Sequence, residues 1–263
     1  MGDGGKRLGV GSVLGRSFHV WGRNVVSFSL LYAFVFAPLI VYGILAFPRP
    51  PRGAGAFLWY VTVLWFGWCL LWFVAPLALI HGVLQELQGD RATLLGCLRV
   101  YLTRIFPAIG GGLLVGTRAF VAAVIGAVPA WFLRKAGLSE DWAAPTVLLL
   151  PILVGCTYWV AVPVAAAERR GPLASMRRAA ELTRGSRLAI FLVVLVTSIV
   201  QFCPFLIARL VAPRGHNPII GWTAIFLVVV LGSCGAVATT VAYHDLRTAR
   251  DGVGVEDLAR VFA

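Results

Sequence analysis

The residue with the clearest capacity for chemistry in this sequence is Arg118, which lies within the apolar run Leu113-Leu-Val-Gly-Thr-Arg-Ala-Phe120. An arginine near the centre of a membrane-spanning helix costs roughly 2.5–3.5 kcal/mol by insertion scales, so it usually faces the bundle interior or a water-filled cavity. No acidic residue lies at a comparable depth in any other predicted span. We therefore expect its charge to be satisfied by backbone carbonyls, water, an anionic ligand, or one of three polar residues, Gln201, Thr239 and Thr240.

Two roles for this arginine follow from its position. In the first, Arg118 and Gln201 are candidate residues for binding a lipid phosphate or another anionic substrate. In the second, Arg118 is structural and satisfies a helix that is broken near the glycines Gly110-Gly-Gly112 and Gly116. Both roles stay open on the sequence alone.

Other residues of the kinds used in catalysis or metal binding are scattered. The four histidines form no HExxH motif and no cluster with cysteine at metal-ligand spacing. The five cysteines share no CxxC spacing, and four of them lie in apolar runs, where cysteine serves as a small packing residue. A G-x-S-x-G elbow, a phosphate-binding loop and a dinucleotide fingerprint are also absent from the sequence. We therefore predict no catalytic residues, no metal site and no cofactor, and hence a protein that is not an enzyme.

The composition indicates which solvent surrounds these residues. Of the 263 residues, 59% are hydrophobic and 13% are charged, and the mean hydropathy is +0.87. Soluble domains hold about 45–50% apolar and about 25% charged residues. Apolar runs of about 20 residues recur along the chain, and a run of that length matches the roughly 30 Å hydrocarbon core of a bilayer. The chain is therefore predicted to be an integral membrane protein.

The net charge of +12 bears on the partners of the protein. A nucleic-acid partner would need a basic face on a soluble fold, with a recognition helix or a stacking platform, so we predict no nucleic-acid binding. The positive charge is instead expected at the cytoplasmic ends of membrane helices, where it meets anionic lipid head groups. Lipids on the cytoplasmic side are thus predicted partners.

Six membrane spans are predicted, at residues 25–47, 57–80, 106–132, 145–165, 188–208 and 219–242. Because backbone polar groups in lipid must be paired within the segment, each span is expected to be an α-helix. A transmembrane β-barrel would show short alternating segments of about 10 residues, and none occur in the sequence. The predicted fold class is an all-α, polytopic transmembrane helical bundle that forms one domain over residues 1–263.

The distribution of basic residues predicts the orientation of these spans. Of the 23 Lys and Arg residues, sixteen lie in one set of terminal and connecting segments, six lie in the opposite loops, and Arg118 lies inside a span. The positive-inside rule places the richer set in the cytoplasm. Both termini are therefore predicted to be cytoplasmic, with a short cytoplasmic tail at residues 245–263.

A basic, amphipathic segment precedes the first, third and fifth predicted spans, at residues 12–23, 93–104 and 173–184. In the first of these elbow segments, Leu14, Phe18 and Trp21 share one helical face, which the two arginines avoid. Such a helix is expected to lie in the membrane interface and to lead the chain into the bilayer. The candidate basic residues of the three elbow segments are Arg16, Arg23, Arg99, Arg104, Arg177, Arg178 and Arg184.

The elbow segments recur at nearly constant intervals. The aligned triplets are Trp21-Gly22-Arg23, Leu102-Thr103-Arg104 and Leu182-Thr183-Arg184, spaced by 81 and 80 residues. A fixed period is a sign of repeated architecture. We therefore predict three approximate repeats of an elbow helix plus a transmembrane hairpin, at residues 10–84, 91–167 and 171–244. The alternative is that basic elbows resemble one another without repetition, since few identities are shared.

Two further patterns indicate how the spans pack. Trp65, Trp68 and Trp72 follow one another at i, i+3 and i+7, which favours a packing or lipid-facing stripe over a stacking platform. In the sixth span, the small-residue faces Gly232-x-x-x-Ala236 and Gly235-x-x-x-Thr239 let helix backbones approach closely, and they are compatible with a homo-oligomer.

Two stretches of the chain carry a family resemblance. The segment ASMRRAAELTRGSRL, from Ala174 to Leu188, resembles an A-x-x-R-S-x-x-L-T-x-G elbow, with Arg178-Ala179 in place of the usual Arg-Ser pair. The segment Tyr243-His-Asp-Leu-Arg247 looks like a Y-x-D-L-R ending. With these features the chain resembles a bacterial group that includes the membrane domain of some glycerophosphoryl diester phosphodiesterases and small YciC-type inner-membrane proteins. The resemblance implies a six-helix, non-catalytic module of the bacterial inner (cytoplasmic) membrane, with no family active site to carry over.

Three classes of function remain. The favoured one is a non-enzymatic membrane protein of the bacterial cell envelope that binds lipids or partner proteins. The second is a transporter, such as an ABC-type permease subunit that works with a separate cytoplasmic ATPase, since an N-terminal elbow, six spans and a cytoplasmic helix after span two also describe small permeases. The third is an intramembrane enzyme, which the missing motifs disfavour.

Overall fold

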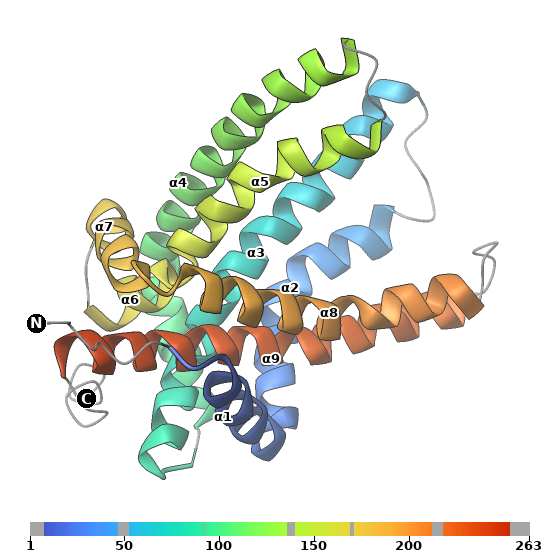
Figure 1. Cartoon of the computed structure of the whole chain (residues 1–263). Helices are drawn as coiled ribbons and strands as arrows, with labels where there is room; N and C mark the ends of the chain where they lie inside the picture. Colours follow the sequence, from blue (N-terminus) through green and yellow to red (C-terminus); the bar gives the residue numbers. More distant parts are fainter. Residues whose placement is uncertain are drawn as a thin grey trace, which may run out of the picture.

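The computed structural model describes residues 8–46, 53–91, 93–135, 140–168, 171–211 and 218–252. Within these ranges the chain forms α-helices and no strand, which confirms the predicted all-α class. The helices of the described part (Figure 1) are α1 Val10–Arg23, α2 Val25–Ala46, α3 Ala54–Gln88, α4 Leu94–Lys135, α5 Glu140–Tyr158, α6 Ala161–Glu168, α7 Pro172–Thr183, α8 Arg187–Val211 and α9 Pro218–Asp251.

Six helical segments of the described chain are long and apolar enough to cross a bilayer. Five of them lie in α2, α3, α4, α8 and α9, and the sixth, Leu149–Glu168, runs over α5 and α6. This confirms the predicted multi-pass membrane protein. Helices are the expected form because each one pairs its backbone groups internally. Two glycines with left-handed backbone mark changes of direction: Gly89 (φ 92°) ends α3, and Gly185 (φ 88°) lies between α7 and α8.

The fourth span differs from the single helix predicted for it. The span is broken after Tyr158, where α5 ends, and α6 begins at Ala161. Pro163 lies in the first turn of α6, where its missing N–H removes no hydrogen bond of that helix. A continuous helix would need this N–H to bond the carbonyl of Trp159, so the proline gives a physical reason for the break.

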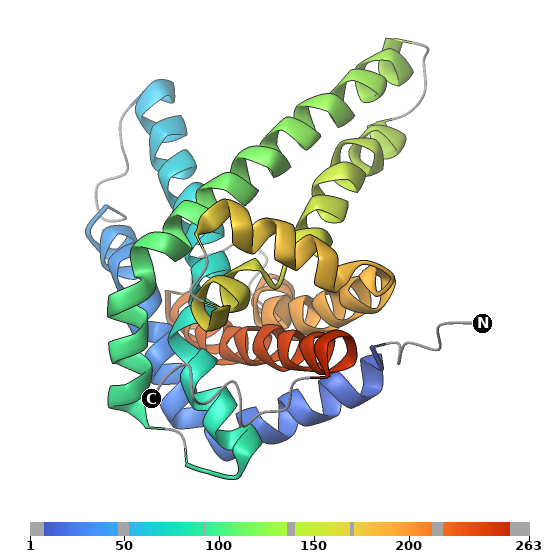
Figure 2. The same ribbon diagram turned by 90° about the vertical axis from the view of Figure 1, so that its left-hand side faces the viewer.

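The second elbow segment also differs from its prediction, because it is not a separate helix. Residues 94–104 continue without interruption into the third span as α4, whereas α1 and α7 are separate from α2 and α8. Pro107 lies inside α4, and a proline in a helix interior bends the helix. Figure 2 shows α4 bent between its two ends. The change of direction that we expected at a break is therefore made within one helix.

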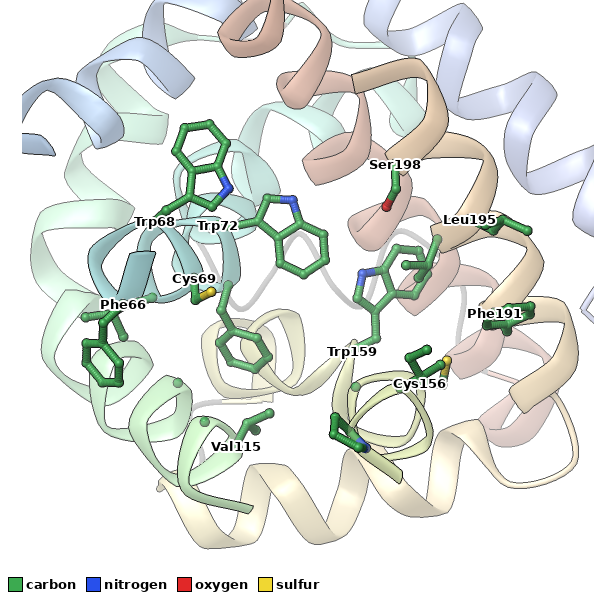
Figure 3. A pocket seen from close by; sticks show the side chains of 18 of the residues that line it. Phe66, Trp68, Cys69, Trp72, Val115, Cys156, Trp159, Phe191, Leu195 and Ser198 are labelled. Atoms are coloured by element: carbon green, nitrogen blue, oxygen red, sulfur yellow. The ribbon is translucent and has the colours of Figure 1, made fainter. Parts of the chain in front are cut away.

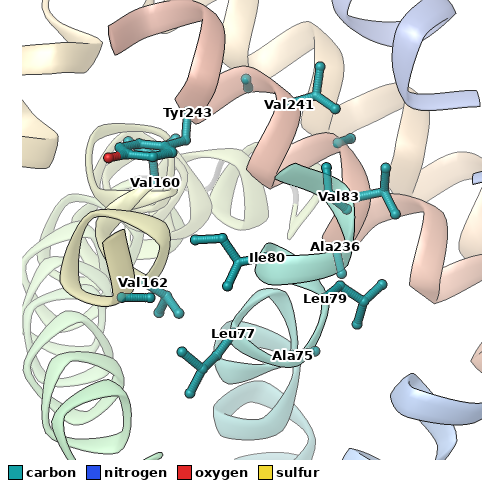
Figure 4. Packing of buried hydrophobic residues seen from close by; sticks show 14 of the residues in the cluster. Ala75, Leu77, Leu79, Ile80, Val83, Val160, Val162, Ala236, Val241 and Tyr243 are labelled. Atoms are coloured by element: carbon teal, nitrogen blue, oxygen red, sulfur yellow. The ribbon is translucent and has the colours of Figure 1, made fainter. Parts of the chain in front are cut away.

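The central helix of the bundle is α9. It packs against α1, α2, α3 and α8, and its residues 236–244 are all buried. Figure 4 shows Ala236, Val241 and Tyr243 of α9 among buried residues of α3 and of the α5–α6 region. Small residues along α9 allow this close packing, as is usual between membrane helices.

Burial is concentrated at one end of the bundle. The buried residues of α2 lie between 28 and 36, those of α3 between 74 and 84, and those of α9 between 224 and 246. Most of these residues lie at the end of the bundle that holds α1, α7 and the α3–α4 connection. We call this end the packed end. At the opposite end, near Ala46, Lys135 and Val211, the helices spread apart (Figure 1), and we call it the open end.

Ion pairs join the helices at the packed end. Arg178 of α7 pairs with Glu168 of α6 at 3.5 Å and with Asp251 of α9. Partial burial lowers the pKa of Arg178, but the hydrogen bonds and charges of Asp251 and Glu168 outweigh it and raise that pKa above its ordinary value. Arg16 of α1 pairs with Asp245 of α9, so the first and last helices are tied at the same end.

The first elbow helix, α1, packs against α9 through the face next to the predicted apolar stripe. Its buried residues are Val13, Ser17 and Val20. Of the predicted stripe, Leu14 and Trp21 are half-buried and Phe18 is 37% exposed. Trp21 Nε1 donates a hydrogen bond of 2.7 Å to Ser233 Oγ of α9. The end of α1 is therefore fixed to the sixth span.

Candidate functional site

An apolar cavity of about 650 Å³ lies between α3, α4, α5 and α8. Ligand sites in proteins typically have volumes of about 300–1,000 Å³, so this cavity has room for one small ligand or one lipid chain. Aromatic rings dominate its lining (Figure 3), and they are supplied by Phe66, Trp68, Trp72, Phe73, Trp159, Phe191 and Phe202.

Glycines keep the α4 and α5 side of the cavity open. Gly112 and Gly116 of α4 and Gly155 of α5 belong to its lining. A Cβ atom added at Gly116 or Gly155 would meet no heavy atom within 4 Å. The space beside these two residues is therefore free for a ligand.

The cavity opens to the surroundings of the bundle between apolar residues of the candidate membrane spans. Three of its lining residues, Phe66, Leu113 and Ile152, are 49%, 43% and 42% exposed. They lie within the candidate membrane spans of α3, α4 and α5. The described residues that line the cavity include no charged side chain. A ligand in this cavity therefore has to be largely apolar, and Ser198 is a polar residue of the wall.

Gln201 of α8 lies directly behind the aromatic wall and is 2% exposed. Its Oε1 accepts a hydrogen bond of 3.2 Å from Trp72 Nε1, and its Nε2 donates one of 3.4 Å to the hydroxyl of Tyr32. Both ends of the buried amide are thus engaged, which avoids the cost of an unsatisfied polar group. Because Trp72 lines the cavity, Gln201 is one side chain removed from it.

A second, smaller cavity of about 20 Å³ lies beside Gln201. Trp72, Phe73 and Trp159 line both cavities and therefore stand between them. The volume is enough for about one water molecule. The hydroxyls of Thr197 and Thr239, which also line it, donate to carbonyls of their own helices at 2.9 Å. Their oxygens remain able to accept a hydrogen bond from such a water.

Gly232 of α9 lets Tyr32 and Gln201 meet. A Cβ atom at this position would lie 2.6 Å from Gln201 Nε2 and 2.8 Å from the Tyr32 hydroxyl. The small-residue face that begins at Gly232 is therefore occupied by α2 and α8 of the same chain, and it is not available to a second copy.

Arg118 is exposed on α4 and lines neither of these cavities. Its Nη1 donates a hydrogen bond of 2.7 Å to the hydroxyl of Tyr158, and its Cζ lies 5.2 Å from the centroid of the Tyr158 ring. This overturns the expectation of an interior-facing arginine. The structure does not bring Arg118 and Gln201 together, and α4 is continuous across the glycines that were expected to break it.

The candidate arginines of the elbow segments have different surroundings. Arg104 and Arg178 are half-buried, whereas the exposed ones are Arg16, Arg23, Arg99, Arg177 and Arg184. Arg16 is paired with Asp245, and Arg23 lies 3.7 Å from Glu86. Several of these residues therefore join helices as well as lying at the surface of the packed end.

Part of the cavity lining is visible in the sequence pattern. Trp68 and Trp72 of the predicted stripe line the cavity, while the side chain of Trp65 lies outside the described residues. Trp159 and Phe191 had no periodic pattern to mark them, because they reach the cavity only through the packing of separate helices. The same is true of Tyr158 as the partner of Arg118.

The fold and the cavity together define a helical, multi-pass membrane protein with an apolar cavity open at membrane depth. No protein-family model, no curated protein and no solved structure matches the chain. In the part of the chain that the structure describes, no group of three or more His, Cys, Asp or Glu residues is placed to hold a metal ion. The resemblance to the phosphodiesterase-associated and YciC-type modules stays a prediction from the sequence.

Proposed function

We propose that the chain is a non-enzymatic integral membrane protein of the bacterial cytoplasmic membrane that binds an apolar lipid chain between α3, α4, α5 and α8. The observation that carries this proposal is the aromatic cavity of about 650 Å³, which opens at the apolar depth of the spans. Its walls suit a lipid chain, since no charged side chain lies among the described lining residues. Partner proteins or a second copy of the chain are further occupants of the exposed apolar surface in the same proposal.

The affinity of such a site would come from packing. A lipid chain in the bilayer is already in an apolar medium, so it gains no hydrophobic free energy by entering the cavity. It gains dispersion contacts with close-packed aromatic walls. Trp72 and Trp159 face it with large, rigid rings at the inner wall. We therefore expect retention of one chain with modest selectivity for its shape.

The proposal includes an orientation for the bundle. The packed end carries the exposed arginines Arg99, Arg177 and Arg184, which supports placing this end in the cytoplasm, against anionic head groups. The elbow segments then lie at the cytoplasmic interface, and both termini lie in the cytoplasm. In this orientation, a ligand enters the cavity from the lipid bilayer.

Cavity-filling variants test the proposal. Because a Cβ at Gly116 or Gly155 meets open space, Gly116→Leu and Gly155→Leu place a side chain in the cavity without a backbone clash. The probe is the methyl ester of cis-parinaric acid, a neutral, fluorescent single chain, added to the purified full-length protein in detergent. Energy transfer from tryptophan to the probe reports its binding. We expect each variant to weaken binding at least about tenfold, equivalent to about 1.4 kcal/mol.

The matched control is Gly221→Leu. Gly221 is a helical glycine of α9 that also faces open space, and it is not part of the cavity lining. Its probe binding should equal that of the unmodified protein. If Gly116→Leu and Gly155→Leu bind the probe as well as the control does, the cavity is not the lipid site.

A transporter is the second candidate, and the break in the fourth span favours it. Trp159 lies in that break, between α5 and α6, and lines the cavity. Transporters often form their substrate sites from discontinuous membrane helices of this kind. Purification in mild detergent from the native host discriminates the two. A cytoplasmic ATPase that copurifies stoichiometrically, or whose gene is adjacent, would favour a permease subunit over the lipid-binding module.

A further inference from the structure

Arg118 and Tyr158 form an outward-facing pair that bridges α4 and α5. The guanidinium is held by a hydrogen bond of 2.7 Å and lies 5.2 Å from the centroid of the phenol ring. Tyrosine is a neutral partner, so it orients the arginine without neutralising its charge. Among the described residues no carboxylate forms an ion pair with Arg118. The charge therefore faces the surroundings of the protein.

The pair leaves most of the guanidinium available. Arginine carries five N–H donors in a planar fork, and here one of its nitrogens is engaged by the Tyr158 hydroxyl. The remaining donors match the oxygens of a phosphate group, which arginine binds through two parallel hydrogen bonds. A phosphate is thus a ligand that suits both the charge and the geometry of Arg118.

The level of this pair follows from its neighbour in the chain. The carbonyl of Thr157 accepts a hydrogen bond of 3.0 Å from Thr183 Oγ1, in the last residue of α7. The next residue, Arg184, is exposed, and the fifth span begins at Arg187. Tyr158 therefore lies near the packed-end limit of the fifth span. Side chains lean toward the N-terminus of their helix, which for α4 is the packed end, so the Arg118 guanidinium extends from within the span toward the head groups.

The surface beyond Arg118 is apolar. Val121 and Ile125 follow it by three and seven residues, so they share its helical face, and they are 49% and 56% exposed. Because α4 runs from the packed end to the open end, these two side chains lie on the open-end side of Arg118. The face presents a cation at one end and apolar groups toward the bilayer core. It therefore complements a phospholipid, which has an anionic phosphate at one end and apolar chains toward the core.

A second copy of the chain does not supply the missing anion. Copies related by an axis along the membrane normal place equal residues at equal depth. In the described ranges the acidic residues lie near helix ends, and they are Glu86, Asp90, Glu140, Asp141, Glu168, Glu181, Asp245 and Asp251. Glu181 lies near the level of Thr183, but its carboxylate is already 3.7 Å from Arg178 of its own helix. A lipid head group lies at the level of α7 and carries a phosphate.

We propose that Arg118, oriented by Tyr158, binds the phosphate of an anionic lipid on the outer face of α4 and α5, with a chain of that lipid along Val121 and Ile125. This site is separate from the cavity, whose lining does not include Arg118 or Tyr158. The inference therefore does not depend on the proposed function.

The test is native mass spectrometry of the full-length protein, purified in detergent with equal amounts of phosphatidylglycerol and phosphatidylcholine. The unmodified protein should retain phosphatidylglycerol preferentially. Arg118→Ala should lower the retained phosphatidylglycerol about tenfold, since one charge-assisted contact is lost. Arg118→Lys should keep part of the preference, and Tyr158→Phe should lower it less than Arg118→Ala does, because the ring remains. These two conservative variants keep the test decisive if Arg118→Ala folds poorly.

The matched control is Arg209→Ala, which removes one exposed arginine from α8 at the open end. It should change phosphatidylglycerol retention less than about twofold, as expected for a screened surface charge. Gly221→Leu, outside both sites, should leave the preference unchanged. The neutral probe of the cavity carries no phosphate for Arg118, so failure of this site and failure of the cavity are distinguishable. In detergent without anionic lipid, the unmodified protein and Tyr158→Phe should have the same melting temperature.

Four results would overturn the proposal. The first is equal retention of the two lipids by the unmodified protein, and the second is unchanged phosphatidylglycerol retention in Arg118→Ala. The third is displacement of phosphatidylglycerol by millimolar inorganic phosphate, which would assign the site to free phosphate. The fourth is a photo-crosslinker at Val121 that captures a polypeptide in native membranes in place of lipid.

Discussion

Gln201 of α8 accepts a hydrogen bond from the indole nitrogen of Trp72 of α3 at a distance of 3.2 Å. The other end of the same amide donates to Tyr32 of α2. Three helices thus meet at one buried amide, directly behind a wall that is apolar on its cavity side. Buried polar networks of this kind fix one arrangement of the helices, because partial disruption leaves groups unsatisfied. The position of the Trp72 ring in the cavity wall therefore depends on Gln201.

The first prediction concerns Gly232, which lies against this amide. In Gly232→Ala the new Cβ would be 2.6 Å from Gln201 Nε2 and 2.8 Å from the Tyr32 hydroxyl. We expect a loss of about 1–3 kcal/mol in the free energy of unfolding, since overpacking forces side chains or backbone to shift. Thermal unfolding of the purified protein in dodecyl maltoside measures it.

The control for this substitution is Gly221→Ala in the same helix, where the Cβ meets open space. Alanine is favoured over glycine in a helix by about 1 kcal/mol, so this variant should be neutral or more stable. The two substitutions therefore have opposite expected signs. A Gly232→Ala protein as stable as Gly221→Ala would show that the amide is not tightly packed against α9.

The second prediction concerns Arg178, which joins α6, α7 and α9 at the packed end. In Arg178→Ala, the Glu168 and Asp251 carboxylates lose their shared partner, and the side chain of Glu168 is only 8% exposed. Asp251 keeps Arg247 at 3.8 Å, so the expected cost is that of the lost charge-assisted hydrogen bonds, about 1.5–3 kcal/mol. Unfolding in a denaturing detergent titration should shift accordingly.

The neighbouring Arg177 provides the matched control for Arg178. It lies on the same helix, carries the same charge and is exposed. Arg177→Ala should change stability by no more than about 0.5 kcal/mol. Equal losses for the two variants would mean that net charge, and not the ion pairs of Arg178, stabilises the packed end.

The six spans could be predicted because their signal is local. A run such as 219–242 is apolar over a length that matches the bilayer. In a membrane such a segment forms a helix, because a helix pairs the backbone polar groups within the segment. The same uniform hydropathy hides which side of a span faces inward. On α4, the exposed Arg118 and the buried Ala122 are one turn apart, and both fit an apolar pattern with a single polar residue.

The cavity was harder to predict than the spans. Trp68 and Trp72 were visible as a stripe, since their spacing is that of one helical face. Trp159 and Phe191 join them from regions far apart in the sequence, and no local pattern records that approach. The break at Trp159 had a local cause in Pro163, yet a proline in a span is compatible with either a kink or a break.

The third prediction concerns the attachment of α1 to α9 through Trp21 and Ser233. Trp21→Phe keeps an aromatic ring but removes the N–H donor of the 2.7 Å hydrogen bond. Ser233 keeps its bond to the carbonyl of Val230 at 2.6 Å, so the expected cost is about 0.5–1.5 kcal/mol. The loss should appear as faster hydrogen exchange of the α1 amides, with the exchange of α9 unchanged.

A matched substitution tests whether that effect is specific. Trp222 of α9 is 46% exposed at the open end, so Trp222→Phe makes the same chemical change away from α1. Its α1 amides should exchange as in the unmodified protein. If Trp21→Phe also leaves α1 exchange unchanged, the helix is held by its other contacts, which include buried Val13 and Val20 and the Arg16–Asp245 pair.

The fourth prediction concerns orientation. The segments at the packed end belong to the set that holds sixteen of the 23 basic residues, and the positive-inside rule places that set in the cytoplasm. In a background without native cysteines, Arg177→Cys lies at the packed end and Lys135→Cys at the open end, and both positions are exposed. A membrane-impermeant maleimide added to intact spheroplasts should label Lys135→Cys and leave Arg177→Cys unmodified. In permeabilised spheroplasts both cysteines should be labelled. The reverse pattern in intact spheroplasts would place the packed end on the outer side of the membrane, together with the proposed phosphate site at Arg118.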